Sequence, residues 1–183
     1  MDLTALIENK QSEQSAYPKK VTLIGHRENK LFPLSFAQQR LWFMDQLEPN
    51  NPLYNMFVAF EFLGELNKEA LKQSFLTLLE RHESLRTAFI TQEGQAYQTV
   101  LPYTAVAELF DFNLEEISDL SELFLQKLAH EEAQQVFYLN NAPLLRVRVL
   151  EYTADRHVLM LSMHHIIHDG WSFVMNSQKF TRH

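Results

Sequence analysis

The sequence predicts an α/β fold, a mixed sandwich in which helices cover a mixed β-sheet. Three observations lead to this prediction. Stretches with the apolar spacing of a helix alternate with stretches rich in branched and aromatic residues. The run His157–His165 is apolar on both of its alternating faces, which is typical of a strand buried on both sides. The 183 residues, 46% of them hydrophobic and 12% aromatic, are enough for one domain with a sizeable core.

Capping residues and apolar spacing predict the first two helices. Ser35 is a candidate N-cap for a helix that ends near Gln46. The residues expected to share one face of this helix are Ala37, Leu41 and Met44. Asn67 can cap a second helix, whose apolar stripe is formed by Leu71, Phe75, Leu78 and His82. His82 is therefore expected to be a hydrogen-bonded histidine of the core.

The strands and a third helix follow from similar signals. Asp119 and Glu122 resemble a capping pair for a helix that runs to about Phe137. Branched and aromatic residues predict a strand over Tyr54–Leu63. Two hairpins are expected, and their strands are Arg86–Thr91 with Gln95–Leu101, and Leu145–Tyr152 with His157–His165. The order of these elements is mixed, so the sheet is expected to be mixed as well.

Composition and charge argue against several classes of protein. The formal net charge of −7 speaks against nucleic-acid binding, which needs a concentrated basic surface. The absence of cysteine excludes disulfides, thiol nucleophiles and thiolate metal sites. Residues 1–30 are expected to be a flexible leader without a signal-peptide core, and no run approaches the ~18 apolar residues of a membrane span. We therefore expect a cytoplasmic protein with no nucleic-acid or membrane partner.

The segment that can carry chemistry is His164-His165-Ile166-Ile167-His168-Asp169-Gly170. Successive side chains of a strand point to opposite faces, so one of the two adjacent histidines should face the interior and the other an opening. An imidazole in that opening can act as a general base near neutral pH. The nearby carboxylate of Asp169 could hold the ring or could pair with an arginine, and spacing alone does not choose between these roles.

Two other interpretations stay open at the level of the residues. A buried His–Asp pair can be purely structural. The segment also contains four potential metal ligands, His164, His165, His168 and Asp169, although adjacent histidines on a strand diverge. The remaining histidines have no companion motif and are expected to be incidental or at the surface; they are His26, His130, His157 and His183.

Three blocks of sequence resemble the core motifs of condensation domains in nonribosomal peptide synthetases. Residues 35–43, SFAQQRLWF, are similar to the first motif, SxAQxRLWF. Residues 81–89, RHESLRTAF, are similar to the second motif, RHExLRTxF. Residues 164–170 are similar to the HHxxxDG signature. The blocks occur in the order of the family, and the resemblance covers roughly residues 31–173.

The resemblance implies an activity and a role for each matching residue. In this family two carrier proteins present thioesters on phosphopantetheine, and the amine of the acceptor attacks the carbonyl of the donor to form an amide. His165 matches the histidine that orients or deprotonates this amine or stabilises the tetrahedral intermediate, and Gly170 matches the glycine whose N–H lies near the oxyanion. His164, Asp169 and Arg86 are implied to support the site, with Asp169 paired to Arg86. No bound cofactor or metal is implied, because the thioester supplies the free energy.

The same resemblance implies a domain organisation. Residues 31–175 match the N-terminal lobe of the two-lobed chloramphenicol acetyltransferase-like fold, and residues 176–183 are expected to be a truncated tail. The C-terminal lobe that completes the site is expected to be missing, so the chain alone is expected to be inactive. Two alternatives are a standalone CoA-dependent acyltransferase and a noncatalytic module that binds a carrier protein. Arg40 and Trp42 are expected to hold the first helix against the sheet.

Overall fold

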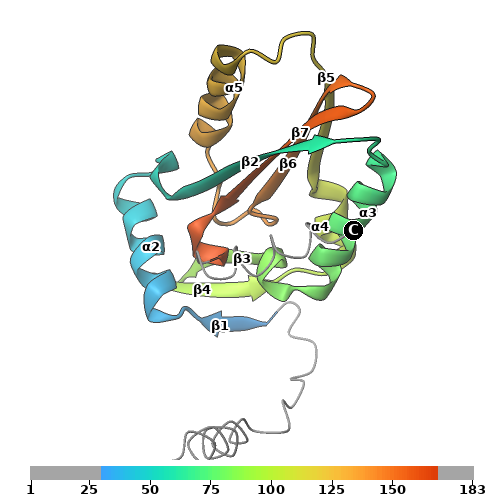
Figure 1. Cartoon of the computed structure of the whole chain (residues 1–183). Helices are drawn as coiled ribbons and strands as arrows, with labels where there is room; N and C mark the ends of the chain where they lie inside the picture. Colours follow the sequence, from blue (N-terminus) through green and yellow to red (C-terminus); the bar gives the residue numbers. More distant parts are fainter. Residues whose placement is uncertain (1–29, 169–183) are drawn as a thin grey trace, which may run out of the picture.

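The structure is a computed structural model, and it describes residues 30–168. These residues form a four-stranded and a three-stranded β-sheet with helices around them (Figure 1). The larger sheet has the strand order β2 (Asn55–Leu63), β7 (Arg156–His164), β6 (Leu145–Thr153) and β5 (Asp111–Glu116). β5 runs parallel to β6, whereas the other neighbours are antiparallel. The predicted mixed sheet is therefore confirmed.

The smaller sheet consists of β1 (Leu31–Pro33), β4 (Gln95–Val100) and β3 (Thr87–Gln92), in this order. β3 and β4 form the first predicted hairpin. Its two turn residues, Glu93 and Gly94, have φ angles of 52° and 79°. Two successive positive φ angles are those of a turn whose twist matches the twist of the flanking strands.

Four helices and three short 3-10 helices complete the described residues. The helices are α2 (Phe36–Leu47), α3 (Lys68–Arg81), α4 (Tyr103–Leu109) and α5 (Glu122–Gln134). The 3-10 helices are η1 (Pro52–Tyr54), η2 (Glu83–Arg86) and η3 (His165–Ile167). Figure 1 shows α5 at one end of the large sheet and α2 beside the smaller sheet. Within residues 30–168, none of the helices has both the length and the apolar character that crossing a membrane requires.

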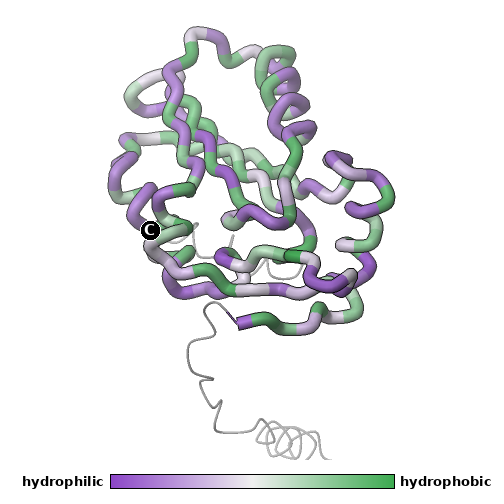
Figure 2. The backbone as a smooth tube through the Cα atoms, turned by 180° about the vertical axis from the view of Figure 1, so that it is seen from behind, coloured by the Kyte–Doolittle hydropathy of each residue, from purple (hydrophilic) through white to green (hydrophobic). Residues whose placement is uncertain are grey.

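β7 lies between β2 and β6 and is covered on both faces. On one face, Val158 and Met160 pack with Leu128 of α5 in one apolar cluster. On the other face, a second cluster joins β7 to β6, α3 and α4; its members include Leu159, Leu161, Met163, Val147, Phe75, Leu79 and Val106. In Figure 2, hydrophobic and hydrophilic residues alternate along the turns of α5, as expected for a helix that buries one side. The prediction of a strand buried on both sides is confirmed.

The start of α2 is fixed by a capping box in which Ser35 is the N-cap, as predicted, and Gln38 is its partner. The Ser35 hydroxyl accepts the backbone N–H of Gln38 at 3.2 Å, and the Gln38 side chain accepts the backbone N–H of Ser35 at 2.9 Å. Both bonds satisfy backbone donors that the first turn of a helix leaves without a partner.

We expect Ser35→Ala to lower the free energy of unfolding by about 1 kcal/mol, because it removes the hydroxyl from the cap. Urea denaturation of the purified chain measures this difference. Ser84→Ala is the matched control, because Ser84 is exposed and lies within η2 rather than at the N-cap of a helix. Equal losses in the two variants would contradict the capping role.

The elements predicted from the sequence need three corrections. The third predicted helix begins at Glu122, because Ser121 and not Asp119 accepts the first-turn N–H, and it already ends at Gln134. Neither α4 nor β5 was predicted from the sequence. α4 has only seven residues, and β5 carries two glutamates on an edge strand, so neither shows a strong periodic pattern.

Two histidines lie in surroundings other than those predicted. His82 follows the last residue of α3 and is exposed, so it is not a core histidine. His157 is only 1% exposed, although it was expected at the surface or to be incidental. It is the second residue of the central strand and lies opposite Glu151, whose carboxylate is 3.9 Å from the imidazole and also contacts Lys68. The burial of His157 follows from the central place of β7 in the sheet.

Candidate active site

The two adjacent histidines lie on different sides of the backbone at the end of β7. His164 is the last residue of the strand and is 3% exposed, whereas His165 opens η3 and is exposed. The predicted divergence of the pair is therefore confirmed: one imidazole is sealed in the interior, and the other faces an opening.

His164 is held as a neutral ring. Its Nδ1 accepts the backbone N–H of Ile166 at 3.2 Å, so the proton of the neutral ring is on Nε2. The rings of Tyr54 and Phe137 lie around it, each with its centroid 6.4 Å from the imidazole. Burial lowers the pKa of His164 to about 4, and the charge of the neighbouring His165 acts in the same direction.

The lowered pKa predicts a pH-dependent stability. Between the unfolded pKa of 6.5 and the folded pKa of about 4, only the unfolded chain binds a proton at this residue. The free energy of unfolding should therefore decrease as the pH falls through this window, by on the order of 2–3 kcal/mol. Above this window it should not depend on the titration of His164. His164→Asn keeps an acceptor for Ile166 but cannot titrate. We expect its urea-derived stability to fall less than that of the wild type between pH 7 and pH 4.5; parallel curves would contradict the assignment.

His165 is oriented by the turn that follows it. Its Nδ1 is 2.7 Å from the backbone carbonyl of His168. A carbonyl can only accept, so Nδ1 donates, and in the neutral ring the lone pair is on Nε2. The short turn of η3 thus fixes both the ring and its tautomer. It leaves Nε2 available as a hydrogen-bond acceptor or base.

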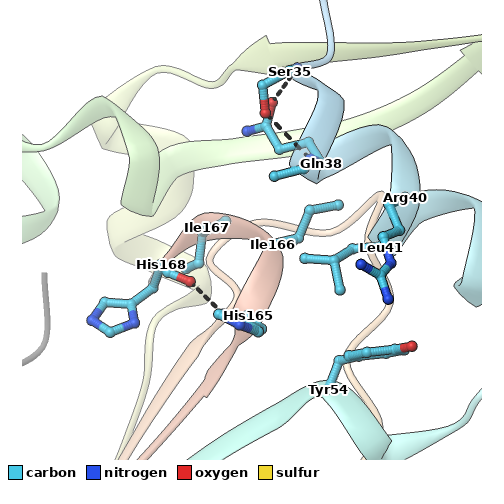
Figure 3. A pocket seen from close by; sticks show the side chains of 10 residues that line it. Ser35, Gln38, Arg40, Leu41, Tyr54, His165, Ile166, Ile167 and His168 are labelled. Atoms are coloured by element: carbon cyan, nitrogen blue, oxygen red, sulfur yellow. Dashed lines mark hydrogen bonds between the residues drawn. The ribbon is translucent and has the colours of Figure 1, made fainter. Parts of the chain in front are cut away.

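The opening in front of His165 is a cavity of ≈ 580 Å³ between η3, α2 and Tyr54 at the end of η1. Figure 3 shows that Arg40 and Leu41 extend from α2 toward the space that His165 and Tyr54 border. The apolar part of the wall is formed by Ala37, Leu41, Ile166 and Ile167. The imidazole of His168 points away from the other labelled side chains. An exposed imidazole whose Nε2 lone pair faces a cavity is suited to accept a hydrogen bond or a proton from a nucleophile.

The comparisons with known proteins identify the family. The sequence profile of the Condensation domain family matches residues 28–182. The chain belongs to the condensation domains of nonribosomal peptide synthetases. A linear gramicidin synthase protein of Brevibacillus parabrevis is 40% identical over 161 residues, which are 87% of this chain and 2% of that protein. Cyclosporin synthetase of Tolypocladium inflatum is 42% identical over 138 residues, which are 75% of this chain and 1% of that protein.

Solved condensation domains have the same fold as this chain. The starter condensation domain of rhizomide synthetase matches with a TM-score of 0.72 at 19% identity, over 81% of this chain and 34% of that chain. The first condensation domain of the calcium-dependent antibiotic synthetase, in complex with a substrate analogue, matches with a TM-score of 0.71 at 23% identity, over 79% of this chain and 35% of that one. This condensation-domain chain thus spans about a third of the solved chains.

Arg86, from the second condensation-domain block, is buried between the last turn of α3 and the end of β4. It is 4% exposed, and its guanidinium donates to the carbonyls of Leu79 and Leu101 at 2.9 and 2.6 Å. A longer bond, 3.4 Å, reaches the carbonyl of Glu80. Arg86 therefore links the last turn of α3 to the end of β4. The predicted partner Asp169 lies outside the described residues, and so does Gly170.

Two residues of the first condensation-domain block have different roles in the structure. Trp42 is half-buried and packs with Leu34 and Phe89, so the expectation that it holds the helix against a sheet is confirmed. Arg40 is exposed and lines the His165 cavity, so the same expectation is wrong for Arg40. Tyr54 was not predicted as a residue of the site. The only available signal for Tyr54 was its place at the start of a predicted strand.

Acidic and imidazole side chains do not gather as metal ligands in the part of the chain that the structure describes. No three of them lie close enough together to hold an ion there. His130, in α5, is exposed. His165 and His168 both line the cavity, and the ring of His165 is oriented by its hydrogen bond to the His168 carbonyl.

Proposed function

We propose that this chain supplies the histidine-bearing part of an active site that joins two carrier-bound acyl groups through an amide bond. The observation that supports this most is the state of His165. Its ring is exposed in the cavity, and its Nδ1 donates to the His168 carbonyl at 2.7 Å, so Nε2 carries the free lone pair. The family of the chain supports the same reaction class, which rests on thioesters attached to phosphopantetheine.

In the proposed step, the amine of the acceptor attacks the thioester carbonyl carbon of the donor. A C–N bond forms, the C–S bond breaks, and the thiol of the donor arm leaves. His165 Nε2 accepts a hydrogen bond from the attacking amine, takes its proton as the tetrahedral intermediate forms, and returns a proton to the departing sulfur. The thioester supplies the free energy, so the step needs no ATP and no resident cofactor. Phosphopantetheine enters as part of the substrates.

The neighbouring residues are proposed to support this step without exchanging protons. His164 is buried and holds η3 through Ile166, and its low pKa of about 4 makes it a poor proton acceptor. Arg86 fixes α3 against the smaller sheet. For Gly170 and Asp169, which lie outside the described residues, we propose an oxyanion N–H and a structural ion pair with Arg86. We place the activity in the cytoplasm, in keeping with a cysteine-free sequence.

The decisive experiment is an amide-formation assay with the complete condensation domain that contains this chain. Both carrier proteins are loaded, one with an acyl donor and one with an aminoacyl acceptor, and the product is measured by mass spectrometry of the carrier-bound chain. We expect an amide product on the acceptor carrier. A product formed equally well from acyl-CoA and a free amine would instead support a CoA-dependent acyltransferase. Carrier binding without any product would support a noncatalytic module.

A further inference from the structure

A second cavity lies at the opposite end of α2 from the His165 cavity. Its volume is ≈ 460 Å³, and it is bounded by the end of α2, by β3 and by residues 137–140. None of its lining residues lines the first cavity. Its wall includes Trp42, Asp45, Asn50 and Tyr138. The proposed condensation reaction gives this cavity no role.

The carboxylate of Asp45 is the charged group of this cavity and has no cationic partner among residues 30–168. It is half-buried, and its hydrogen bond comes from the amide of the neighbouring Gln46 at 3.1 Å. Burial raises the pKa of Asp45, and this effect is larger than the opposite effect of the Gln46 bond. An ionised carboxylate that is partly removed from water is stabilised by a nearby cation.

The end of α2 adds to the negative potential of the cavity. Trp42, Asp45 and Gln46 belong to the last two turns of the helix, where the peptide dipoles place partial negative charge. A basic residue in the last turn would offset this charge, but α2 has none there. Pro49 and Asn50, which follow the helix directly, also line the cavity.

Aromatic rings form the other part of the wall. Cations bind favourably over the faces of such rings. The ring of Phe137 already has the guanidinium of Arg146 3.7 Å from its centroid. Trp42, which is half-buried, and Tyr138, which is 59% exposed, are the rings available to a ligand. Ring faces and a carboxylate together suit an organic cation with an apolar stem.

A metal ion fits this wall poorly. Asp45 is the only acidic side chain among the lining residues, whereas Ca²⁺ and Mg²⁺ take six or more oxygen ligands, several of them carboxylates or waters. We propose that this cavity binds an alkylammonium group of the kind carried by a lysine side chain, with Asp45 as its counter-ion and Trp42 and Tyr138 as its walls. The amide oxygen of Asn50 is available to accept a bond from the ammonium N–H groups.

The test is a titration of the full chain with n-butylammonium chloride at pH 7.5 and constant ionic strength. Trp171→Phe serves as the background, so that fluorescence reports on Trp42. We expect saturable binding that Asp45→Asn weakens at least fivefold and Tyr138→Ala at least twofold. Glu116→Gln removes the same charge from an exposed position on β5 and should leave the affinity unchanged.

Two further ligands distinguish the possible sources of the group. n-Pentanol has a similar stem without charge, and Nα-acetyl-lysine amide presents the ammonium as a polypeptide would. Binding of the lysine derivative at least as tight as that of butylammonium supports a lysine side chain as the occupant, and tighter binding of butylammonium supports a free amine. Equal affinity for n-pentanol, or an affinity unaltered by Asp45→Asn and Tyr138→Ala, would overturn the proposal.

Tyr138→Ala changes an exposed side chain, so it remains informative if Asp45→Asn does not fold. The experiment does not depend on condensation activity.

Discussion

Replacing His165 by alanine is expected to slow amide formation by the complete condensation domain by about 10²- to 10⁴-fold, the usual contribution of a positioned acid–base group. The variant loses the Nε2 lone pair. His164 is sealed in the interior, and the ring of His168, which also lines the cavity, points away from the other labelled side chains (Figure 3). The effect should appear in kcat, since the proton moves only in the transition state.

The fold of this variant should be unaffected. The imidazole of His165 is exposed, and its hydrogen bond within the described residues is to the His168 carbonyl, which water can replace. We expect the midpoint of thermal unfolding to shift by no more than about 2 °C, as for other surface substitutions. His130→Ala, an exposed histidine of α5, is the matched control and should keep full activity. Near-normal turnover by His165→Ala on loaded carriers would refute the proposed role.

The sequence could predict that the side chains of His164 and His165 face different sides, because the alternation of side chains along a strand is a local property. Alternation along β7 places every second side chain on the same face, so a strand that is apolar on both faces must be central, and the residues at its end must diverge. His164 and His165 follow this rule. The tautomer of His165 could not be predicted, because it depends on the turn of η3 that brings the His168 carbonyl to Nδ1.

Contacts between distant segments account for what the sequence did not reveal. Arg40 and Tyr54 share a cavity with His165 only because α2 and η1 lie beside η3, and no local pattern contains that information. The same holds for Asp45, which shares a cavity with residues more than ninety positions away. His82 illustrates the opposite error. Its spacing fits the stripe of α3, but the helix ends one residue earlier and His82 is exposed.

The low pKa of His164 explains how two neighbouring imidazoles can serve different ends. If both rings were charged, they would repel each other inside one short segment. Burial keeps His164 neutral at physiological pH, so it can accept the Ile166 N–H and stabilise the turn. His165 is exposed to the cavity, and its Nε2 lone pair is not used by the hydrogen bond to the His168 carbonyl. In the proposed reaction, the interior ring would position the turn and the exposed ring would exchange the proton.

Arg86→Met is expected to cause the largest loss of stability, about 3 kcal/mol or more. Methionine fills much of the space of the arginine stem, but it leaves the carbonyls of Leu79 and Leu101 without their donors. Each buried polar group that loses its partner costs about 1–3 kcal/mol, and bonds from a charged donor lie at the upper end. Urea denaturation of the purified chain measures the loss.

Two companion variants decide whether the hydrogen bonds or the positive charge of Arg86 matter. Arg81→Met removes the same charge from an exposed position and should change stability by less than about 0.5 kcal/mol. Arg86→Lys keeps the charge but cannot reach two carbonyls with the fixed fork of a guanidinium, so we expect it to recover less than half of the loss. Full recovery by lysine would mean that charge alone holds α3 to the smaller sheet. The hydrogen bonds to the carbonyls of Leu79 and Leu101 would then not explain the loss of stability.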